Sequence, residues 1–181
     1  MATWIALFRG INVGGNKILR MKELVLLFEE LDFEEVRTYI QSGNVVFRAR
    51  DTSTKKIALR VEDAVAEAHG FRPRIIILSA KKIRRVMEAN PFPAASDNPK
   101  SLHCFFLAEV PVTPDLQTIT DLKSNGEEFV LVDKVFFLHA PQGIGRSKLA
   151  PRVEKLLGVA STARNWRTVT KIDEIARQID R

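Results

Sequence analysis

Five short segments without acidic residues carry the side chains best suited to holding an anion. Each combines arginine, lysine, amide or hydroxyl groups with turn-forming residues, and they span residues 9–17 (RGINVGGNK), 39–44 (YIQSGN), 71–85, 143–148 (GIGRSK) and 162–171. Cationic side chains and unpaired backbone N–H groups are the usual ligands of phosphate and carboxylate groups. The sequence therefore predicts an anion-binding site.

The first segment, RGINVGGNK, contains three glycines and lies ahead of a predicted helix. Its backbone N–H groups can wrap an anion, with Arg9, Asn12 and Lys17 as contacts. The glycine spacing matches neither the dinucleotide-binding pattern nor the P-loop pattern. The alternative interpretation is a strained turn without a ligand.

The GIGRSK segment places a guanidinium, a hydroxyl and an ammonium group at consecutive positions, Arg146, Ser147 and Lys148. We expect all three to contact an anion, because no acidic residue occurs between Asp133 and Glu154. The alternative is a solvated loop in which Arg146 pairs with an acidic neighbour.

In the last segment, ARNW, we expect Arg164 to hold phosphate and Asn165 to orient the ligand, while Trp166 offers a ring on which a base or sugar can stack. The alternative role for Trp166 is packing, as a plug between subdomains.

In YIQSGN, the residues Gly43 and Asn44 are explained by a tight turn, which leaves Gln41 and Ser42 as groups that can orient a polar ligand. The segment 71–85 reads as a buried strand followed by a helix with a solvated basic face.

None of the five segments contains Asp, Glu, His or Cys. They give no support to paired-carboxylate hydrolysis, a Ser-His-Asp triad or a carboxylate-held magnesium ion. The single cysteine, Cys104, and three widely separated histidines predict neither a disulfide nor a metal site, and we expect no cofactor. Arginine and lysine can still stabilise a charged transition state, so whether the chain is an enzyme is open.

The elements that must position these segments follow from hydrophobic periodicity. Strands are predicted over 3–11, 36–40, 45–47 and 74–78, and amphipathic helices over 21–31 and from a cap at Thr52, Ser53 or Thr54 to Gly70. A connecting helix capped by Ser79 follows, and a Pro-rich linker occupies 91–100.

The second half repeats the order, with strands over 102–108, 129–132, 135–139 and 159–163, a helix starting at 113–114, a helix ending at Gly158 and a final helix. The predicted fold is α+β, with two ferredoxin-like βαββαβ halves in tandem, a connecting helix and a C-terminal helix. We expect the first ferredoxin-like half over 1–79, the connecting helix and linker over 80–100, and the second half with the C-terminal helix over 101–181.

The right-handed crossover between parallel strands predicts which loops lie at the same end of each sheet. The first two strands of a ferredoxin-like unit run parallel through a right-handed crossover, so RGINVGGN and QSGN should be neighbours. By the same logic GIGRSK and ARNW should emerge at one end of the second half. Four of the five segments thus form two predicted loop clusters, and the segment 71–85 belongs to neither.

Composition is that of a globular protein, with 181 residues, 45% hydrophobic and 28% charged. No run is long enough to span a membrane and the start lacks a secretory signal, so we expect a cytoplasmic protein without a membrane partner. The formal net charge of +6 attracts phosphate-bearing partners.

The motifs RGINVGG, TYIQSGNVVF, NPFP, GIGRSKL and TARNWRTV, in this order, resemble the small, mostly bacterial family called Domain of Unknown Function 1697. The resemblance runs from Ala6 to about Asp173. It implies a shared α+β fold and carries no activity, cofactor or catalytic residue. Arg167 departs from the pattern, which has Asn there.

The leading functional hypothesis is a protein whose basic polar loops bind a phosphorylated ligand, above all a nucleic acid or a nucleotide. One alternative is an enzyme that acts on a small anionic substrate by arginine and lysine electrostatics. A second alternative is a protein-interaction module.

Overall fold

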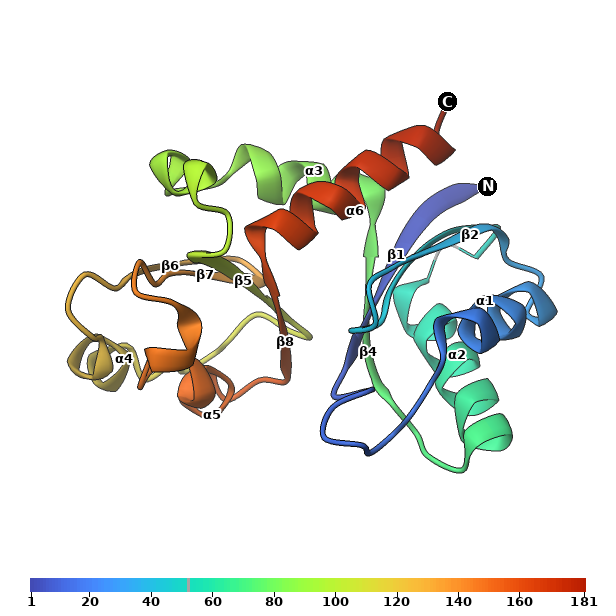
Figure 1. Ribbon diagram of the computed structural model, residues 1–181, viewed down its shortest axis with the longest axis horizontal. Coiled ribbons are helices and arrows are strands. Elements are labelled where there is room, and N and C mark those ends of the chain that lie inside the picture. The colour runs from blue at the N-terminus through green and yellow to red at the C-terminus, as the bar shows by residue number, and fades with distance from the viewer. Residues whose placement is uncertain (52) are drawn as a thin grey trace. The chain divides into compact units, whose positions relative to one another are not determined.

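The computed structural model describes residues 1–51 and 53–181, and the chain divides into two compact units. The first unit comprises residues 1–85 and 171–181, and the second comprises residues 86–170. Each unit contains one four-stranded antiparallel sheet with helices on it (Figure 1). This arrangement confirms the predicted α+β fold with two ferredoxin-like halves.

The first unit follows the order βαββαβ. Its elements are β1 (Ala2–Arg9), α1 (Met21–Glu30), β2 (Glu34–Tyr39), β3 (Asn44–Ala49), α2 (Thr54–His69) and β4 (Arg74–Ser79). The strands lie in the order β2-β3-β1-β4, with β1 paired antiparallel to both β3 and β4. Helices α1 and α2 cover one face of this sheet (Figure 1).

The core of the first unit lies between this sheet and its two helices. Alternate residues of β1, Trp4, Ala6 and Phe8, face the helices and join one buried cluster with Phe28 of α1. The ring of Phe28 contacts those of Phe8, Phe33 and Phe47 at centroid distances of 5.0 to 6.3 Å. Aromatic burial of this kind is a main source of stability in a small core.

Helix α2 begins and ends where the sequence predicts. The Ser53 hydroxyl accepts a hydrogen bond from the Lys56 backbone N–H, and Gly70 ends the helix with a φ of 72°. Thr52, another candidate for the cap, lies outside the described residues. The predicted Ser79 cap is also present, since its hydroxyl accepts from the backbone N–H of Lys82 at the start of α3 (Ala80–Glu88).

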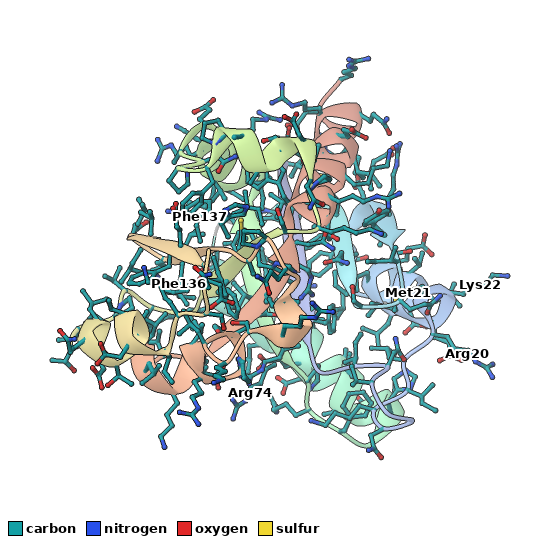
Figure 2. The ribbon with its side chains drawn as sticks, turned by 60° about the vertical axis from the view of Figure 1, so that its left-hand side comes forward. Arg20, Met21, Lys22, Arg74, Phe136 and Phe137 are labelled. Carbon is teal, nitrogen blue, oxygen red and sulfur yellow. The ribbon has the colours of Figure 1, made fainter. Side chains whose placement is uncertain are left out.

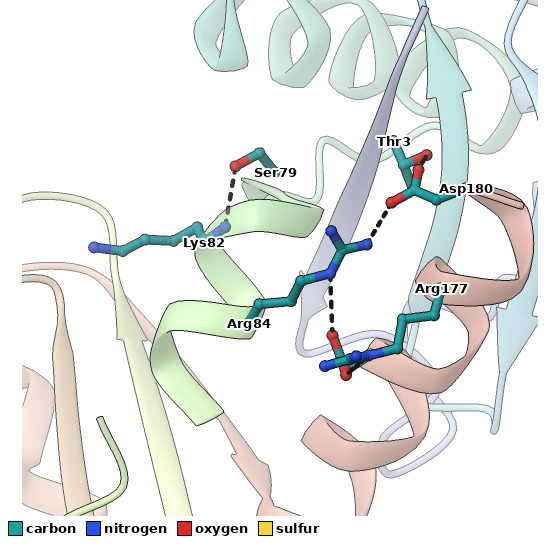
Figure 3. A network of polar contacts seen from close by, with 7 residues as sticks. Thr3, Ser79, Lys82, Arg84, Arg177 and Asp180 are labelled. Atoms are coloured by element: carbon teal, nitrogen blue, oxygen red, sulfur yellow. Dashed lines mark hydrogen bonds and ion pairs between the residues drawn. The ribbon is translucent and has the colours of Figure 1, made fainter. Parts of the chain in front are cut away.

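The C-terminal end of α6 (Trp166–Ile179) is fixed to β1 and α3 by a polar network (Figure 3). Arg84 pairs with Asp173 and Asp180, and the Thr3 hydroxyl donates a hydrogen bond to Asp180 at 2.5 Å. Burial alone would raise the pKa of Asp180, but the hydrogen bonds from Thr3 and Arg84 outweigh it and hold this pKa below its usual range. Residues 171–181 therefore belong with the first unit.

The second unit repeats the strand order. It contains β5 (Leu102–Leu107), α4 (Leu116–Leu122), β6 (Glu128–Val132), β7 (Val135–His139), α5 (Val153–Leu157) and β8 (Ser161–Asn165). The sheet order is β6-β7-β5-β8, and α4 and α5 lie on one face of it (Figure 1). Phe105 and Phe136, from β5 and β7, pack in the core between this sheet and the helices.

The structure adds detail to three local expectations for this unit. The linker over 91–100 contains a 3₁₀ helix, Pro93–Asp97. The helix expected to end at Gly158 is a single short helix, α5, preceded by 3₁₀ turns at Ile144–Arg146 and Ala150–Arg152. The last strand begins at Ser161, two residues later than expected. Proline lies in the first turn of the 3₁₀ helices at Pro93–Asp97 and Ala150–Arg152, and Gly158 ends α5 with a φ of 68°, which glycine adopts without strain.

In the described part of the chain, no helix combines the length and the apolar character needed to cross a membrane.

Candidate anion-binding loops

The glycine-rich loop after β1 folds into a small hairpin. Val13 pairs with Asn16, whose N–H donates to the Val13 carbonyl, and Gly14 and Gly15 occupy the turn with φ of 60° and 76°. Two consecutive residues with positive φ define the tight hairpin turn for which glycine is preferred. The loop therefore presents its turn to solvent in a defined shape.

Asn12 ties this hairpin to its surroundings. Its side-chain amide donates to the carbonyls of Leu19 and Gln41 at 2.9 and 2.8 Å, and its oxygen accepts from the Leu19 N–H at 2.8 Å. The amide group predicted to contact an anion is thus occupied in holding the loop.

The loop and the β2–β3 turn are neighbours, which confirms the prediction from handedness. The Phe8 N–H donates to the Gly43 carbonyl at 2.8 Å, and Gly43 is so close to β1 that a side chain there would lie 2.5 Å from the Phe8 Cβ. Gln41 and Ser42, the predicted orienting residues, are both exposed in this turn.

Several cations surround the two loops. Lys17, Arg20 and Lys22 are exposed, and Figure 2 shows Arg20 and Lys22 extending away from the ribbon at the start of α1. Arg20 precedes α1, and its side chain does not cap the first N–H groups of the helix. At the same end of the sheet Arg9 lies opposite Arg74 of β4, a pairing of like charges.

Left-handed backbone conformations are concentrated in these loops. Asn12, Lys17 and Ile40 have φ of 56°, 51° and 50°. A branched side chain such as that of Ile40 rarely adopts this region, and such strain is common at functional sites.

We expect Asn12→Ala to lower the free energy of unfolding by about 1 to 2 kcal/mol, because Leu19 and Gln41 lose their hydrogen-bond partners. Amide hydrogen exchange should show faster exchange at Leu19. Asn16→Ala is the matched control, since Asn16 is exposed in the same loop. Unchanged exchange at Leu19 would contradict the assigned role.

In the second unit, the GIGRSK segment is shaped by a 3₁₀ turn. The side chains of Arg146 and Lys148 are exposed and, within residues 1–51 and 53–181, form no ion pair. The Ser147 hydroxyl accepts a hydrogen bond from the Ala150 N–H at 2.9 Å and so caps the following turn. Two of the three predicted contacts are therefore available to a ligand, and the third supports the backbone.

The predicted residues of ARNW are largely buried. Arg164 is 8% exposed and donates to the Thr162 hydroxyl and the Ala163 carbonyl at 2.8 Å. Burial lowers the pKa of Arg164 to about 10, which still leaves it charged at neutral pH. Asn165 accepts from the Thr168 N–H at the start of α6, and Trp166 is 6% exposed. The ring of Trp166 therefore has little surface left on which a base could stack, and its burial favours the alternative in which Trp166 serves in packing.

Strand register places the two segments of this second cluster at one end of their sheet. Both β7 and β8 pair antiparallel with β5, and their last residues, His139 and Asn165, lie opposite its first two residues. The segments that follow β7 and β8 therefore leave the sheet at the same end.

A groove of about 620 Å³ in the first unit is absent from the sequence-based predictions. Carboxylates dominate its lining, which includes Glu29, Asp32, Glu34 and Asp51 beside Arg50 and Arg60. Arg60 donates to Asp51 and to the Leu31 carbonyl, and its guanidinium lies over the Phe33 ring. This groove is unsuited to a phosphate, and its residues are too scattered in the sequence to form a recognisable pattern.

The remaining reactive groups are not arranged for chemistry. Cys104 is buried in β5, and burial raises the pKa of its thiol, which opposes formation of the thiolate. Within the described residues, no group of three or more His, Cys, Asp and Glu side chains is placed to hold a metal ion.

Comparison with known proteins relates the chain to a family of unknown function. A family model described as a protein of unknown function (DUF1697) matches residues 1–137. The solved structure of the conserved bacterial protein SP0830 from Streptococcus pneumoniae is similar, with a TM-score of 0.78 and 24% identity over 97% of this chain and 98% of that one. This likeness concerns the fold. No curated protein matches the chain.

Proposed function

The chain belongs to the DUF1697 family of proteins of unknown function, and on that premise we propose that its basic polar loops bind a phosphorylated ligand, a nucleic acid or a nucleotide. The principal site is the loop cluster of the first unit, formed by residues 9–22 and 39–44. Arg146 and Lys148 of the second unit give a further pair of exposed cations for the same class of ligand.

One observation carries this proposal. The glycine hairpin and the β2–β3 turn are held together by Asn12 and Gly43, and Lys17, Arg20 and Lys22 are exposed beside them. Among the residues that the structure describes, Glu23 pairs with one of these cations, at 3.8 Å from Arg20. Exposed cations next to an uncapped helix start attract phosphate, since the helix dipole and the charges act in the same direction.

The test is fluorescence anisotropy with a labelled oligonucleotide and with a labelled nucleotide at several salt concentrations. We expect binding at low salt that weakens as salt rises, because the release of counterions from the phosphates favours association less when the surrounding salt concentration is higher. The double variant Lys17→Gln, Lys22→Gln should bind about tenfold more weakly and with a shallower salt slope.

Lys55→Gln, Lys56→Gln is the matched control. It removes the same charge from exposed positions at the start of α2, where Ser53 already caps the helix. Equal weakening by the two double variants would show that only net charge matters and would overturn the proposed site. Absence of binding to every phosphorylated ligand would overturn the function.

A further inference from the structure

The loop cluster of the first unit also carries exposed aliphatic side chains. Val13, Ile18 and Ile40 are 66%, 60% and 50% exposed. All three belong to segments that Asn12 joins, since Asn12 bonds both to Leu19, next to Ile18, and to Gln41, next to Ile40. The proposed phosphate site is therefore bordered by apolar surface.

Exposed amides accompany these aliphatic residues. The side chains of Asn16 and Gln41 are exposed, and neither has a hydrogen-bond partner within residues 1–51 and 53–181. Amides of this kind can pair with the polar edge of a nucleobase.

A free phosphate, an anionic membrane surface and a single-stranded nucleic acid can each pair with the exposed cations. They differ in how they would contact the neighbouring aliphatic and amide side chains. A free phosphate would leave Val13 and Ile18 in water. A membrane surface would cover them but would also strip water from the amides of Asn16 and Gln41, which is unfavourable without new partners. An unstacked base offers an apolar face and a polar edge, and it is attached to a phosphate.

We infer that this loop cluster binds single-stranded nucleic acid, with phosphates at Lys17, Arg20 and Lys22. The bases pack on Val13 and Ile18, and their edges pair with the amides of Asn16 and Gln41. A duplex cannot present base faces in this way because its bases are stacked on one another. The inference rests on the proposed function and assigns it a ligand class.

The experiment compares a labelled oligothymidylate with an abasic strand of the same length and charge, using the intact chain. We expect the oligothymidylate to bind about five- to tenfold more tightly than the abasic strand. The double variant Val13→Ser, Ile18→Ser should remove this difference and bind the two strands with equal affinity, because the cations remain in place and the apolar contacts with the bases are lost.

Leu26→Ser, Leu59→Ser is the matched control, because both leucines are similarly exposed, at 58% and 54%, but lie on α1 and α2. This variant should bind both strands as the wild type does. Circular dichroism of each variant verifies that it is folded.

The outcomes separate the two proposals. Equal affinity for both strands, or loss of oligothymidylate binding in the leucine control, overturns the base contacts and leaves the phosphate site standing. Tight binding to vesicles of anionic phospholipid with no preference for oligothymidylate overturns the nucleic-acid assignment in favour of a lipid headgroup. Failure of every phosphate-bearing probe to bind overturns the proposed function itself.

Discussion

Gly43→Ala should lower the free energy of unfolding by about 3 kcal/mol, since overpacking against a core and a positive φ are both unfavourable for alanine. Gly43 has a φ of 75°, and a Cβ at this position would lie 2.5 Å from the Phe8 Cβ and 2.6 Å from the Ile11 Cδ1. Phe8 and Ile11 are 1% exposed, so neither has free space into which to move. Urea denaturation followed by circular dichroism measures the change.

Gly10→Ala is the control that separates two causes of the lost stability, the steric clash of the new Cβ and the strain of a positive φ in alanine. Gly10 has a similar φ of 66°, but no atom lies within 4 Å of a Cβ built there. We expect this variant to lose only about 1 kcal/mol. Equal losses for the two variants would show that the close approach of Gly43 to Phe8 is not what the turn requires.

The same substitution bears on function. The Gly43 carbonyl accepts the Phe8 N–H and so holds the β2–β3 turn beside the glycine hairpin. Alanine at this position would push the turn away from Phe8 and separate Gln41 from Asn12. We therefore expect weaker ligand binding from Gly43→Ala even at temperatures where the variant is folded, and little change from Gly10→Ala.

The fold was predictable because its elements have strong local signals. The nearly continuous apolar run of β1, in which every residue from Thr3 to Phe8 is buried, is typical of a strand in the interior of a protein. The helical spacing of Leu24, Leu27 and Phe28 is the pattern that one buried face imposes on a helix. Ser53 and Gly70 mark the ends of α2 for reasons of local hydrogen bonding and backbone freedom. Handedness then sufficed to bring RGINVGGN next to QSGN.

The role of each polar residue within the loops was much less predictable. Asn12, Ser147 and Asn165 were expected to meet a ligand, yet their side chains bond to backbone groups of the chain itself. Sequence indicates which donors and acceptors are present but not which atoms they meet. A hydroxyl or an amide shortly before a helix is an equally good cap, and that local signal accounts for Ser147 and Asn165.

Burial was the second property of the candidate residues that the sequence did not reveal, because it depends on tertiary packing. Arg164 and Trp166 are adjacent to exposed-looking polar residues in the sequence but are 8% and 6% exposed. The aliphatic residues Val13 and Ile18 show the reverse, since their sequence neighbours do not reveal that they face solvent. The cations Lys17, Arg146 and Lys148 are exposed, and their contact with an anion stays a prediction.

Acid should destabilise the protein through His103, a residue outside the proposed site. His103 lies in the middle of the second sheet, opposite Leu138 of β7 and Asn165 of β8, and it is 8% exposed. Burial lowers the pKa of its imidazole to about 4, against an opposing contribution from a hydrogen bond with the Ser101 backbone. The ring is therefore neutral in the folded protein at pH values where it is charged in the unfolded chain.

The sign of the effect follows from proton binding. Between the unfolded pKa of 6.5 and the folded pKa of about 4, the unfolded chain binds a proton that the folded chain does not. Lowering the pH through this window therefore favours unfolding, and we expect His103 alone to remove about 2 kcal/mol of stability between pH 7 and pH 4.5.

His103→Gln removes the titrating ring and keeps a polar side chain. Urea denaturation at pH 7 and at pH 4.5 should show a smaller loss of stability in this variant than in the wild type, whatever the variant's stability at pH 7. His69→Gln, in the last turn of α2, reports the effect of removing an imidazole elsewhere. If the wild type and His103→Gln lose stability in parallel over this range, the buried ring is not the origin of acid sensitivity, and the carboxylates that pair with Arg84 become the groups to test next.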